Sequence, residues 1–594
     1  MGFFSRNKAS AKTEQPAVSK APSVTPEPPE ETPLQKKRIS TILDDVQYDD
    51  FENDDYEDDL APEDRDSDES ELEEYEEHKH RFLERNMAQS VSQLSTLMGL
   101  CGLSNTSTVE SLTALANEEL ARTYSLLSLD LKIRRLSPTM HRGDPLLYKS
   151  VIDDDQIHLI EGITKKLNHV LDMHDPNLQQ KYLAGNKTLL DRYGRISKVI
   201  GRGSYGVIKV IVSGENETEY TKKNGIYAVK ELLKRPATDL KHKEARETFI
   251  ERVTSEFIVS CTLNNKHLVR TLDLMITVPS GKGGKSSCFE DEIKISQVME
   301  CTPGGDLFTY CKKIIETKQY FTIDELDCII KQVAKGLWYM HNHGVAHCDL
   351  KLENILIIFD RHNKQSTPDG LRTRMNVKIS DFGKANVFRT KWDTKEQLYT
   401  SGPLGSEPYM APEEFLGSKN GFSLMKKDCW ALGIITLVLF NMRRSLFHRS
   451  GGHSCLLQFL DSESGELDSK SYNSVYLWHS TGHRVMRLRK YKDPVFEEYT
   501  KHCMKADYEA SSREWTVHTK GTFAPIETIF DLNDSQIDPK FMDLYEQDAD
   551  FEEGEHAIRK FFVYKLLDVN PSTRVTVDDL LKGDWLGTVE SCGS

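Results

Sequence analysis

Three glycines, spaced as Gly-x-Gly-x-x-Gly, stand between two stretches that are rich in valine and isoleucine. β-Branched residues favour strands, so the sequence predicts a strand, a tight turn and a second strand. Because glycines lack side chains, the backbone N–H groups of such a turn can approach a chain of phosphates closely. A dinucleotide-binding fold uses a similar string to open a helix, but here more strand follows. The positions predicted to contact a nucleotide are Ile200, Gly201, Arg202, Gly203, Ser204, Tyr205, Gly206, Val207 and Ile208.

A lysine follows at the end of the next apolar strand, in the sequence Tyr-Ala-Val-Lys. We expect Ala228 and Lys230 to lie in the nucleotide site, with the ammonium group on the α- and β-phosphates. This charge needs a carboxylate partner, and a helix is predicted over residues 244–263. Glu256 is the preferred partner and Glu251 is the alternative. Without the motifs on either side, both would be interpreted as solvent-facing helix charges.

A second apolar strand breaks into a Pro-Gly-Gly turn, which is the pattern that a hinge between two lobes requires. At such a hinge, the carbonyl group of Glu300 and the N–H group of Thr302 can pair with adenine. We expect Met299 to border the deeper part of the pocket and Asp306 to lie near the ribose.

The string His-Cys-Asp-Leu-Lys-Leu-Glu-Asn is the most specific in the chain. Phosphoryl transfer to a hydroxyl group requires a carboxylate for the proton, a cation for the moving charge and an oxygen ligand for a metal. Asp349, Lys351 and Asn354 match these needs in that order. Asp381, in an Asp-Phe-Gly triplet, supplies a second oxygen ligand for Mg²⁺. The predicted catalytic residues are therefore Asp349, Lys351 and Lys230.

Two further segments follow: a Gly-Ser-Glu-Pro-Tyr-Met-Ala-Pro-Glu run that ends at Glu413, and Asn-Pro-Ser-Thr-Arg, which ends at Arg574. With these segments, residues 194–586 resemble a eukaryotic protein kinase. The resemblance implies an α+β, bilobal fold, in which a small antiparallel β lobe with one helix precedes a large, mainly α lobe. It also implies ATP and Mg²⁺ as cofactors, and a buried ion pair between Glu413 and Arg574.

The resemblance further implies a serine/threonine kinase, because Lys351 stands two residues after the catalytic aspartate, where tyrosine kinases lack a lysine. Ser406 stands where most such enzymes have threonine, and it can offer a hydroxyl group to Asp349 and Lys351. In their detail, the Leu-Lys-Leu-Glu-Asn and Gly-Ser-x-Pro-Tyr-x-Ala-Pro-Glu segments are most similar to the fungal halotolerance and nitrogen-permease-reactivator kinases. This similarity implies protein substrates with Ser or Thr, and control of plasma-membrane ion or nutrient transporters.

The sequence departs from the kinase pattern in two ways. Cys348 replaces the arginine that usually precedes the catalytic aspartate and binds an activation-loop phosphate, so activity is expected not to depend on that phosphate. Four insertions also lengthen the domain, and Gly, Ser and charged residues predict that they are surface loops. They cover residues 281–290, 360–374, 450–480 and 516–555.

The part of the chain before the kinase-like region has two different compositions. Residues 1–79 are rich in proline and then acidic, and residues 44–77 alone hold 20 Asp or Glu and a single Arg. Such a segment buries too little apolar surface to fold, so it is predicted to be a disordered tail. Residues 80–190 show apolar residues at helical spacing, including Leu120, Tyr124 and Leu127, and predict a helical extension. This extension could support the kinase body or bind a regulator.

The charge and the cysteine content of the chain limit the compartment in which we expect the protein and the partners that we expect it to bind. The net charge of −16 is concentrated in the acidic tail, so we expect no nucleic-acid binding driven by overall charge. The 11 cysteines include no Cys-x-x-Cys pair and show no zinc-site spacing, which favours a reduced cytoplasmic or nuclear compartment. The longest strongly apolar stretch, residues 430–440, is about half of the roughly 20 residues that cross a bilayer, so no direct membrane insertion is expected.

Three interpretations follow from these residues. A catalytic protein kinase is favoured over a pseudokinase scaffold that acts through its N-terminal region, because scaffolds commonly lose a catalytic group. A kinase for small molecules is disfavoured by the complete segment that ends in Ala-Pro-Glu.

Asp306 and Glu353 predict a preference for arginine before the phosphorylated residue. Ser40, which follows Lys-Lys-Arg-Ile, is the candidate phosphorylation site in the chain. Residues 190–594 are expected to be sufficient for phosphate transfer.

Overall fold

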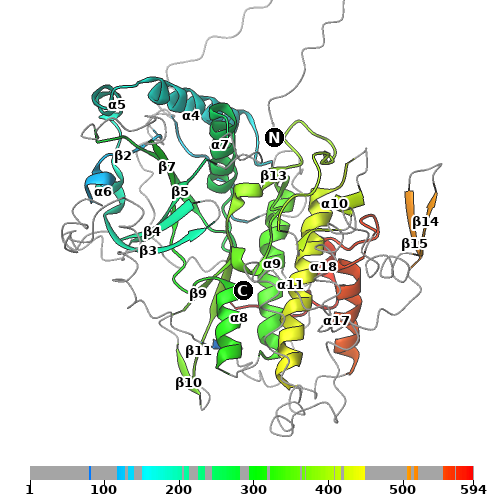
Figure 1. Cartoon of the computed structure of the whole chain (residues 1–594). Coiled ribbons are helices and arrows are strands. Elements are labelled where there is room, and N and C mark those ends of the chain that lie inside the picture. The colour runs from blue at the N-terminus through cyan, green and yellow to red at the C-terminus, as the bar shows by residue number, and fades with distance from the viewer. Residues whose placement is uncertain are drawn as a thin grey trace, which may run out of the picture. The chain divides into compact units, whose positions relative to one another are not determined.

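The computed structural model gives one compact unit that contains every residue described below (Figure 1). Residues 1–78 lie outside the described part of the chain, and so do the predictions for the tail and for Ser40. The structure describes residues 79–81, 117–127, 131–139, 150–203, 206–212, 225–234, 244–280, 293–317, 321–360, 364–367, 370–406, 409–411, 413–416, 421–447, 505–509, 514–518, 553–568 and 570–592.

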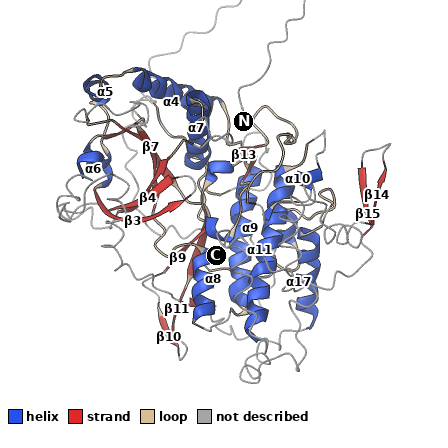
Figure 2. Cartoon of the chain, viewed as in Figure 1, coloured by secondary structure: helices blue, strands red, loops and turns tan. Residues whose placement is uncertain are grey.

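The small lobe is built on a six-stranded antiparallel sheet with the order β2-β6-β7-β5-β4-β3 (Figures 1 and 2). Gly203 pairs with Gly206, so β3 and β4 form the predicted strand–turn–strand around the glycines. The strands are rich in valine and isoleucine, as the sequence predicted. Their bounds are Thr123–Ser125 for β2, Arg195–Gly203 for β3, Gly206–Val212 for β4, Ile226–Leu232 for β5, Thr271–Thr277 for β6 and Lys294–Glu300 for β7.

Helix α7, Arg246–Thr262, packs against this sheet and carries Glu256. Most of its residues from Val253 onward are buried, because the sheet, the large lobe and helix α4 surround it. Its surroundings therefore fix the direction in which Glu256 points. This arrangement, together with the helical second lobe, confirms the predicted bilobal kinase fold.

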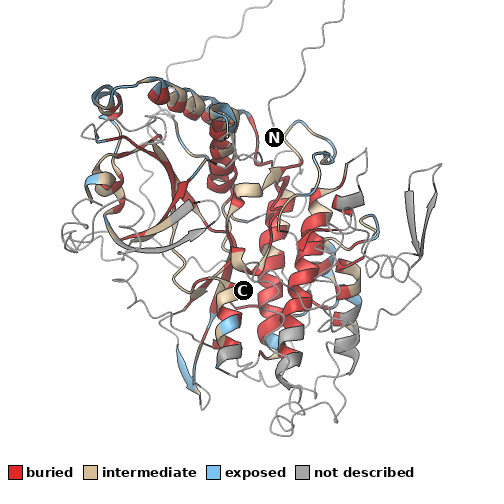
Figure 3. Cartoon of the chain, viewed as in Figure 1, coloured by how far each residue is buried: buried red, intermediate tan, exposed pale blue. Residues whose placement is uncertain are grey.

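The large lobe is centred on two buried helices, α9 and α11 (Figure 3). Thr322 and Glu325 form a capping box that starts α9, since each side chain accepts a hydrogen bond from the backbone of the other. None of the helices in the described part of the chain is long and apolar enough to span a bilayer. The helices are α8 Leu307–Glu316, α9 Ile323–Asn342, α10 Glu413–Leu416, α11 Leu424–Phe447, α17 Glu553–Leu566 and α18 Val577–Lys582.

Short strands and turns between these helices position the functional loops. Strand β8 pairs with β13, and β9 pairs with β12. The turn η4 follows β8, and η5 follows β12. A separate hairpin consists of β14 and β15. The bounds are Val345–Ala346 for β8, Leu352–Asn354 for η4, Ile355–Phe359 for β9, Met375–Ile379 for β12, Phe382–Lys384 for η5, Asn386–Val387 for β13, Lys505–Glu509 for β14 and Glu514–His518 for β15.

The extension before the kinase region is packed on the kinase body, and it is only partly helical. Tyr124 lies in strand β2, at the edge of the main sheet, so the helical interpretation of Tyr124 is wrong. Pairing with the exposed edge of β6 outweighed the helical spacing of the apolar residues. Three helices follow, which are α4 Asp154–Asp172, α5 Pro176–Leu183 and α6 Leu189–Tyr193.

This extension packs on α7 and braces it. Helix α4 packs on α7, and Ile163, Leu167 and Phe257 belong to the same buried core. Arg135 donates hydrogen bonds from its guanidinium group to Cys261 O in α7 at 3.1 Å and to Thr271 O in β6 at 2.8 Å. Removal of this layer would expose apolar surface on α7. That residues 190–594 are sufficient for phosphate transfer stays a prediction, and without this layer we expect the transfer to be slower than in the full chain.

The insertion over residues 360–374 is a hairpin and not only a surface loop. Its strands β10, Gln365–Thr367, and β11, Gly370–Thr373, pair with each other. Strand β1, His80–Arg81, then pairs with β11. The free edge of the hairpin thus anchors the start of the N-terminal extension. The insertions at 281–290 and 450–480 lie outside the described residues, and so does most of 516–555.

His267 connects the two lobes through hydrogen bonds. Its burial leads us to predict that acid destabilises the fold. Its backbone carbonyl accepts a hydrogen bond from Ile379 N at 2.8 Å, and its Nδ1 atom lies 3.2 Å from Val377 O. Burial lowers the pKa of this histidine from 6.5 to about 3. The folded state therefore keeps His267 neutral while the unfolded state takes up a proton below about pH 6.5.

We predict that the free energy of unfolding is unaffected by His267 above pH 6.5 and falls below it, by about 1.4 kcal/mol per pH unit at most. Urea titrations at pH 7.5, 6.5 and 5.5 would measure this slope. His267→Gln should flatten the slope between pH 6.5 and 5.5. His158→Gln is the control, because the side chain of His158 is 88% exposed. Equal slopes for the wild type and His267→Gln would contradict the prediction.

Candidate active site

The ammonium group of Lys230 lies between two carboxylates that come from different parts of the fold. Lys230 is in β5, and its Nζ atom donates hydrogen bonds to Glu256 Oε1 at 2.8 Å and to Asp381 Oδ1 at 2.7 Å. Lys230 and Glu256 are buried, and Asp381 is mostly buried. The structure thus brings Lys230 together with the preferred carboxylate of α7 and with a predicted metal ligand.

Lys230 and Asp381 are both charged in this site. Burial acts to lower the pKa of Lys230, but the charges of Glu256 and Asp381 outweigh it and raise the pKa. Burial acts to raise the pKa of Asp381, but the charge of Lys230 and its hydrogen bond hold the pKa below its usual value. A buried ammonium and a buried carboxylate side by side suit a ligand that carries both phosphates and a divalent cation.

The backbone at the Asp-Phe-Gly triplet is shaped to hold this arrangement. Asp381 has a φ of 61°, in the left-handed region that few residues other than glycine adopt. A Cβ atom at Gly383 would lie 3.2 Å from Asp381 Oδ1 and 3.2 Å from Glu256 Oε2. A glycine at this position therefore leaves room for the two carboxylates.

Asp349 is held by a hydroxyl group and a cation. Its Oδ1 atom accepts a hydrogen bond from Ser406 Oγ at 2.7 Å, and its Oδ2 atom lies 3.1 Å from Lys384 Nζ. Asn354 Nδ2 donates to the backbone carbonyl of Asp349 at 2.8 Å, which orients the amide oxygen away from that carbonyl. The expected contact between Ser406 and Asp349 is confirmed. Lys351 lies at the start of η4, beside this group.

A buried carboxylate that the sequence analysis missed positions the loop around Asp349. Asp428, in α11, accepts hydrogen bonds from the backbone N–H groups of His347 at 2.7 Å and Cys348 at 2.8 Å. It also contacts His341 Nε2 at 3.0 Å. Burial acts to raise the pKa of Asp428, but the hydrogen bond with His341 and its charge lower the pKa. The sequence signal was the Asp-Cys-Trp-Ala-Leu-Gly motif that begins at Asp428 and opens an apolar helix, and no contact with the catalytic loop was assigned to it.

His347 also links the catalytic loop to the Asp-Phe-Gly triplet. The Asp349 N–H group donates to His347 Nδ1 at 3.2 Å, so this nitrogen is an acceptor. The Nε2 atom therefore carries the proton and donates to Ser380 O at 2.9 Å. The ring of His347 also packs edge-on against Phe382. One imidazole thus links Asp349, the predicted base, to the segment that carries Asp381, the predicted metal ligand.

Cys348 is buried and adopts a φ of 62°. Because it is a cysteine, it offers no cation that could bind a phosphate at the surface. A buried ion pair holds the activation segment, which is the part of the chain that ends at Glu413. Glu414 accepts hydrogen bonds from Leu404 N at 2.9 Å and Ala411 N at 2.7 Å, and it lies 3.1 Å from Lys427 Nζ. These contacts fix both ends of the segment that contains Ser406.

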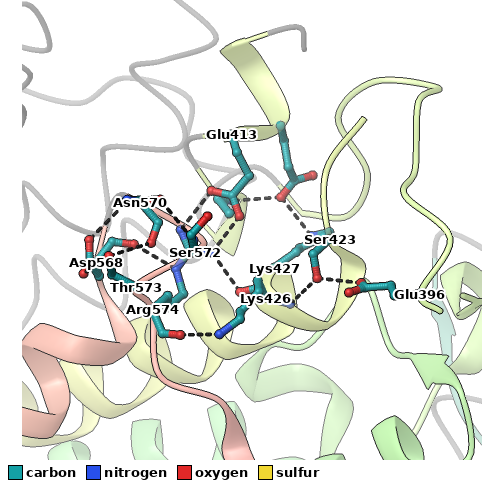
Figure 4. A network of polar contacts seen from close by, with 12 residues as sticks. Glu396, Glu413, Ser423, Lys426, Lys427, Asp568, Asn570, Ser572, Thr573 and Arg574 are labelled. Atoms are coloured by element: carbon teal, nitrogen blue, oxygen red, sulfur yellow. Dashed lines mark hydrogen bonds and ion pairs between the residues drawn. The ribbon is translucent and has the colours of Figure 1, made fainter. Parts of the chain in front are cut away.

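The expected ion pair of the large lobe is confirmed (Figure 4). Arg574 donates from both terminal nitrogens to the carboxylate of Glu413, at 2.6 and 2.9 Å. Arg574 also lies over the ring of Trp430 and donates to Asp568 O. This bidentate geometry anchors the end of the activation segment to α11 and to the chain before α18.

The predicted hinge residues lie at the end of β7 and in the turn between β7 and α8. Met299 pairs with Ala228 across the sheet, and β7 ends at Glu300. Both carboxylate oxygens of Asp306 accept hydrogen bonds from Thr309, at 2.7 and 2.9 Å. Asp306 thus caps the start of α8, and its roles toward ribose and arginine stay predictions.

The remaining predicted residues are described only in part. The backbones of Ile200 to Gly203 and of Gly206 to Ile208 lie in β3 and β4. Ser204 and Tyr205 lie outside the described residues. Thr302 and Gly305 form a turn between β7 and α8. Burial raises the pKa of Glu353, and the preference for arginine stays a prediction.

Comparison with known proteins identifies the family. The model for the protein kinase domain matches residues 195–586, which is more than half of the chain. The predicted domain began one residue earlier and ended at the same position. The chain therefore belongs to the protein kinase family.

The relatives are fungal serine/threonine kinases. A Kluyveromyces lactis protein named "Probable serine/threonine-protein kinase HAL5-like" is 27% identical over 75% of this chain. A protein of the same name from Vanderwaltozyma polyspora is 30% identical over 72%. The serine/threonine-protein kinase hal4 of Schizosaccharomyces pombe is 36% identical over 42%. The chain spans less than half the length of these relatives, at 47%, 44% and 33%.

We predict that activity does not need a phosphate in the activation segment, because Glu414 and Lys427 hold that segment. Phosphatase treatment of the full chain should leave most of the turnover, measured as transfer of radiolabelled phosphate to a generic basic protein. Lys427→Met should reduce turnover at least about 10-fold, since it leaves Glu414 buried and unpaired. Lys391→Met is the control, because Lys391 is half-exposed and pairs with Asp154.

A large loss on phosphatase treatment that rephosphorylation reverses would contradict this prediction. In that case a basic residue such as Lys384 would have to bind the phosphate.

Proposed function

We propose that this protein transfers the γ-phosphoryl group of ATP to serine or threonine hydroxyl groups in proteins. The observation that carries the proposal is the hydrogen bond from Ser406 Oγ to Asp349 Oδ1. The carboxylate that is proposed as the base already accepts a hydrogen bond from an aliphatic hydroxyl group. A substrate serine or threonine presents the same group to the same acceptor.

The residues present fit ATP with magnesium. Asn354 and Asp381 offer the amide and carboxylate oxygens that Mg²⁺ prefers, and both lie next to the proposed base or to Lys230. Bound there, Mg²⁺ would neutralise the charge of the phosphates. Lys230, oriented by Glu256, would position the α- and β-phosphates.

Each proposed catalytic group has a defined task. Asp349 takes the proton from the attacking hydroxyl group, and Lys351 neutralises charge on the transferred phosphoryl group. The backbone at Glu300 and Thr302 binds adenine, and the turn between β3 and β4 covers the phosphates. The bond from the hydroxyl oxygen to phosphorus forms as the bond to the β-phosphate oxygen breaks.

The physiological role proposed on resemblance is control of ion or nutrient transporters. The similarity to the fungal halotolerance and nitrogen-permease-reactivator kinases supports this proposal. The N-terminal region is proposed to carry contacts for regulators, in addition to the brace that its described part provides for α7.

We predict that Lys230→Met and Asp349→Asn each lower phosphate transfer by about 100-fold or more. The assay is transfer from radiolabelled Mg·ATP to a generic basic protein, followed by phosphoamino-acid analysis that should show phosphoserine or phosphothreonine. Asp154→Asn is the control, because Asp154 is 75% exposed and outside the site.

Wild-type turnover in both variants would contradict the assigned roles. ATP binding by the wild type without any transfer would instead favour the pseudokinase scaffold.

A further inference from the structure

Three metal-ligating side chains from distant parts of the chain meet inside the large lobe. They are His80, Cys328 and Cys592, and their ligand atoms all lie within 4.8 Å of one another. All three residues are buried, with exposures of 0%, 0% and 2%. Within the described part of the chain this is the one such cluster. None of the roles proposed above uses these residues.

Each ligand is held by a different element. His80 lies in β1, which pairs with the hairpin strand β11. Cys328 lies in the first turns of α9, in the core of the large lobe. Cys592 follows α18, in a segment that is bound to α9 because Lys331 Nζ donates to Val589 O. The side chains are therefore brought together by tertiary packing and not by a short sequence motif.

The sulfur atom of Cys328 accepts two N–H hydrogen bonds. Cys592 N donates to Cys328 Sγ at 3.3 Å, and Gln332 Nε2 donates to it at 3.2 Å. The orientation of the Gln332 amide is fixed by the backbone of β12. Its Oε1 atom accepts from Val377 N, and its Nε2 atom donates to Met375 O. Two N–H donors directed at one sulfur stabilise negative charge on it, as in metal–thiolate sites.

We propose that His80, Cys328 and Cys592 bind a zinc ion. One imidazole nitrogen and two thiolate sulfurs form a donor set that suits Zn²⁺ and does not suit Mg²⁺ or Ca²⁺, which prefer oxygen. Zinc binding releases the two thiol protons and neutralises the thiolates within the buried site. The fourth ligand of the tetrahedron comes from outside these three residues, as water does in sites with three protein ligands.

The site is structural, because it lies far from the catalytic loop. Cys328 is 14 residues before the end of α9 at Asn342, and the catalytic loop follows that end. At 1.5 Å per residue, this distance is about 20 Å. The ion joins β1 and the segment after α18 to α9. Tyr310 Oη reinforces the first connection by donating to Arg81 O at 3.0 Å.

Metal analysis of the full chain tests the proposal. Protein purified without chelators should contain about one zinc ion per chain by inductively coupled plasma mass spectrometry. His80→Gln and Cys592→Ser should each lose most of this zinc. Cys311→Ser is the matched control, since Cys311 is equally buried but lies on α8, outside the cluster. It should keep its zinc.

A second readout reports the ligands directly. After replacement of zinc by Co²⁺, the wild type should show thiolate-to-cobalt charge-transfer absorption, which Cys592→Ser weakens and Cys311→Ser preserves. Wild-type protein without bound metal would overturn the proposal. So would full zinc content in both His80→Gln and Cys592→Ser, or a disulfide between Cys328 and Cys592 in non-reduced peptides.

Discussion

The contact between Lys230 and Glu256 is the interaction on which the site depends. It joins the sheet of the small lobe to α7, and through Asp381 it reaches the large lobe. A buried ion pair gains little free energy unless its geometry is held, because both charges lose their hydration. The position of α7 therefore decides whether the pair forms. Here the extension provides that position, through α4 and through Arg135.

The large lobe also uses buried charge to hold its loops. Asp428 binds the backbone on both sides of the His347–Cys348 bond, and Glu414 binds the activation segment at two points. A cysteine can replace the usual arginine because neither network needs a cation at position 348. Together with the packing of the extension on α7, these contacts hold the functional loops in place through interactions within the chain.

The sequence was sufficient to predict the structure around a residue where that structure depends on local spacing. The glycine turn, Lys230, the string around Asp349 and the Asp-Phe-Gly triplet each predict their own strand or loop, and the bilobal fold follows from their order. It was insufficient where the partners are far apart in the chain. The pairing of β2 with β6 overrode helical spacing at Tyr124. The Asp-Cys-Trp-Ala-Leu-Gly motif that begins at Asp428 predicted the start of a helix but not its contacts with the catalytic loop. His80, Cys328 and Cys592 have no zinc-site spacing, since only the folded chain brings them together.

Hydrogen exchange along α7 tests most directly whether the extension holds the active arrangement. In the full chain, Arg135→Ala removes the hydrogen bonds to Cys261 O and Thr271 O. Arg134→Ala is the neighbouring control, because Arg134 pairs with Asp153 within the extension. The account predicts exchange about 10-fold faster over residues 246–262 and a matching loss of turnover in Arg135→Ala, with neither change in Arg134→Ala. Unchanged protection of α7 together with unchanged turnover in Arg135→Ala would contradict it.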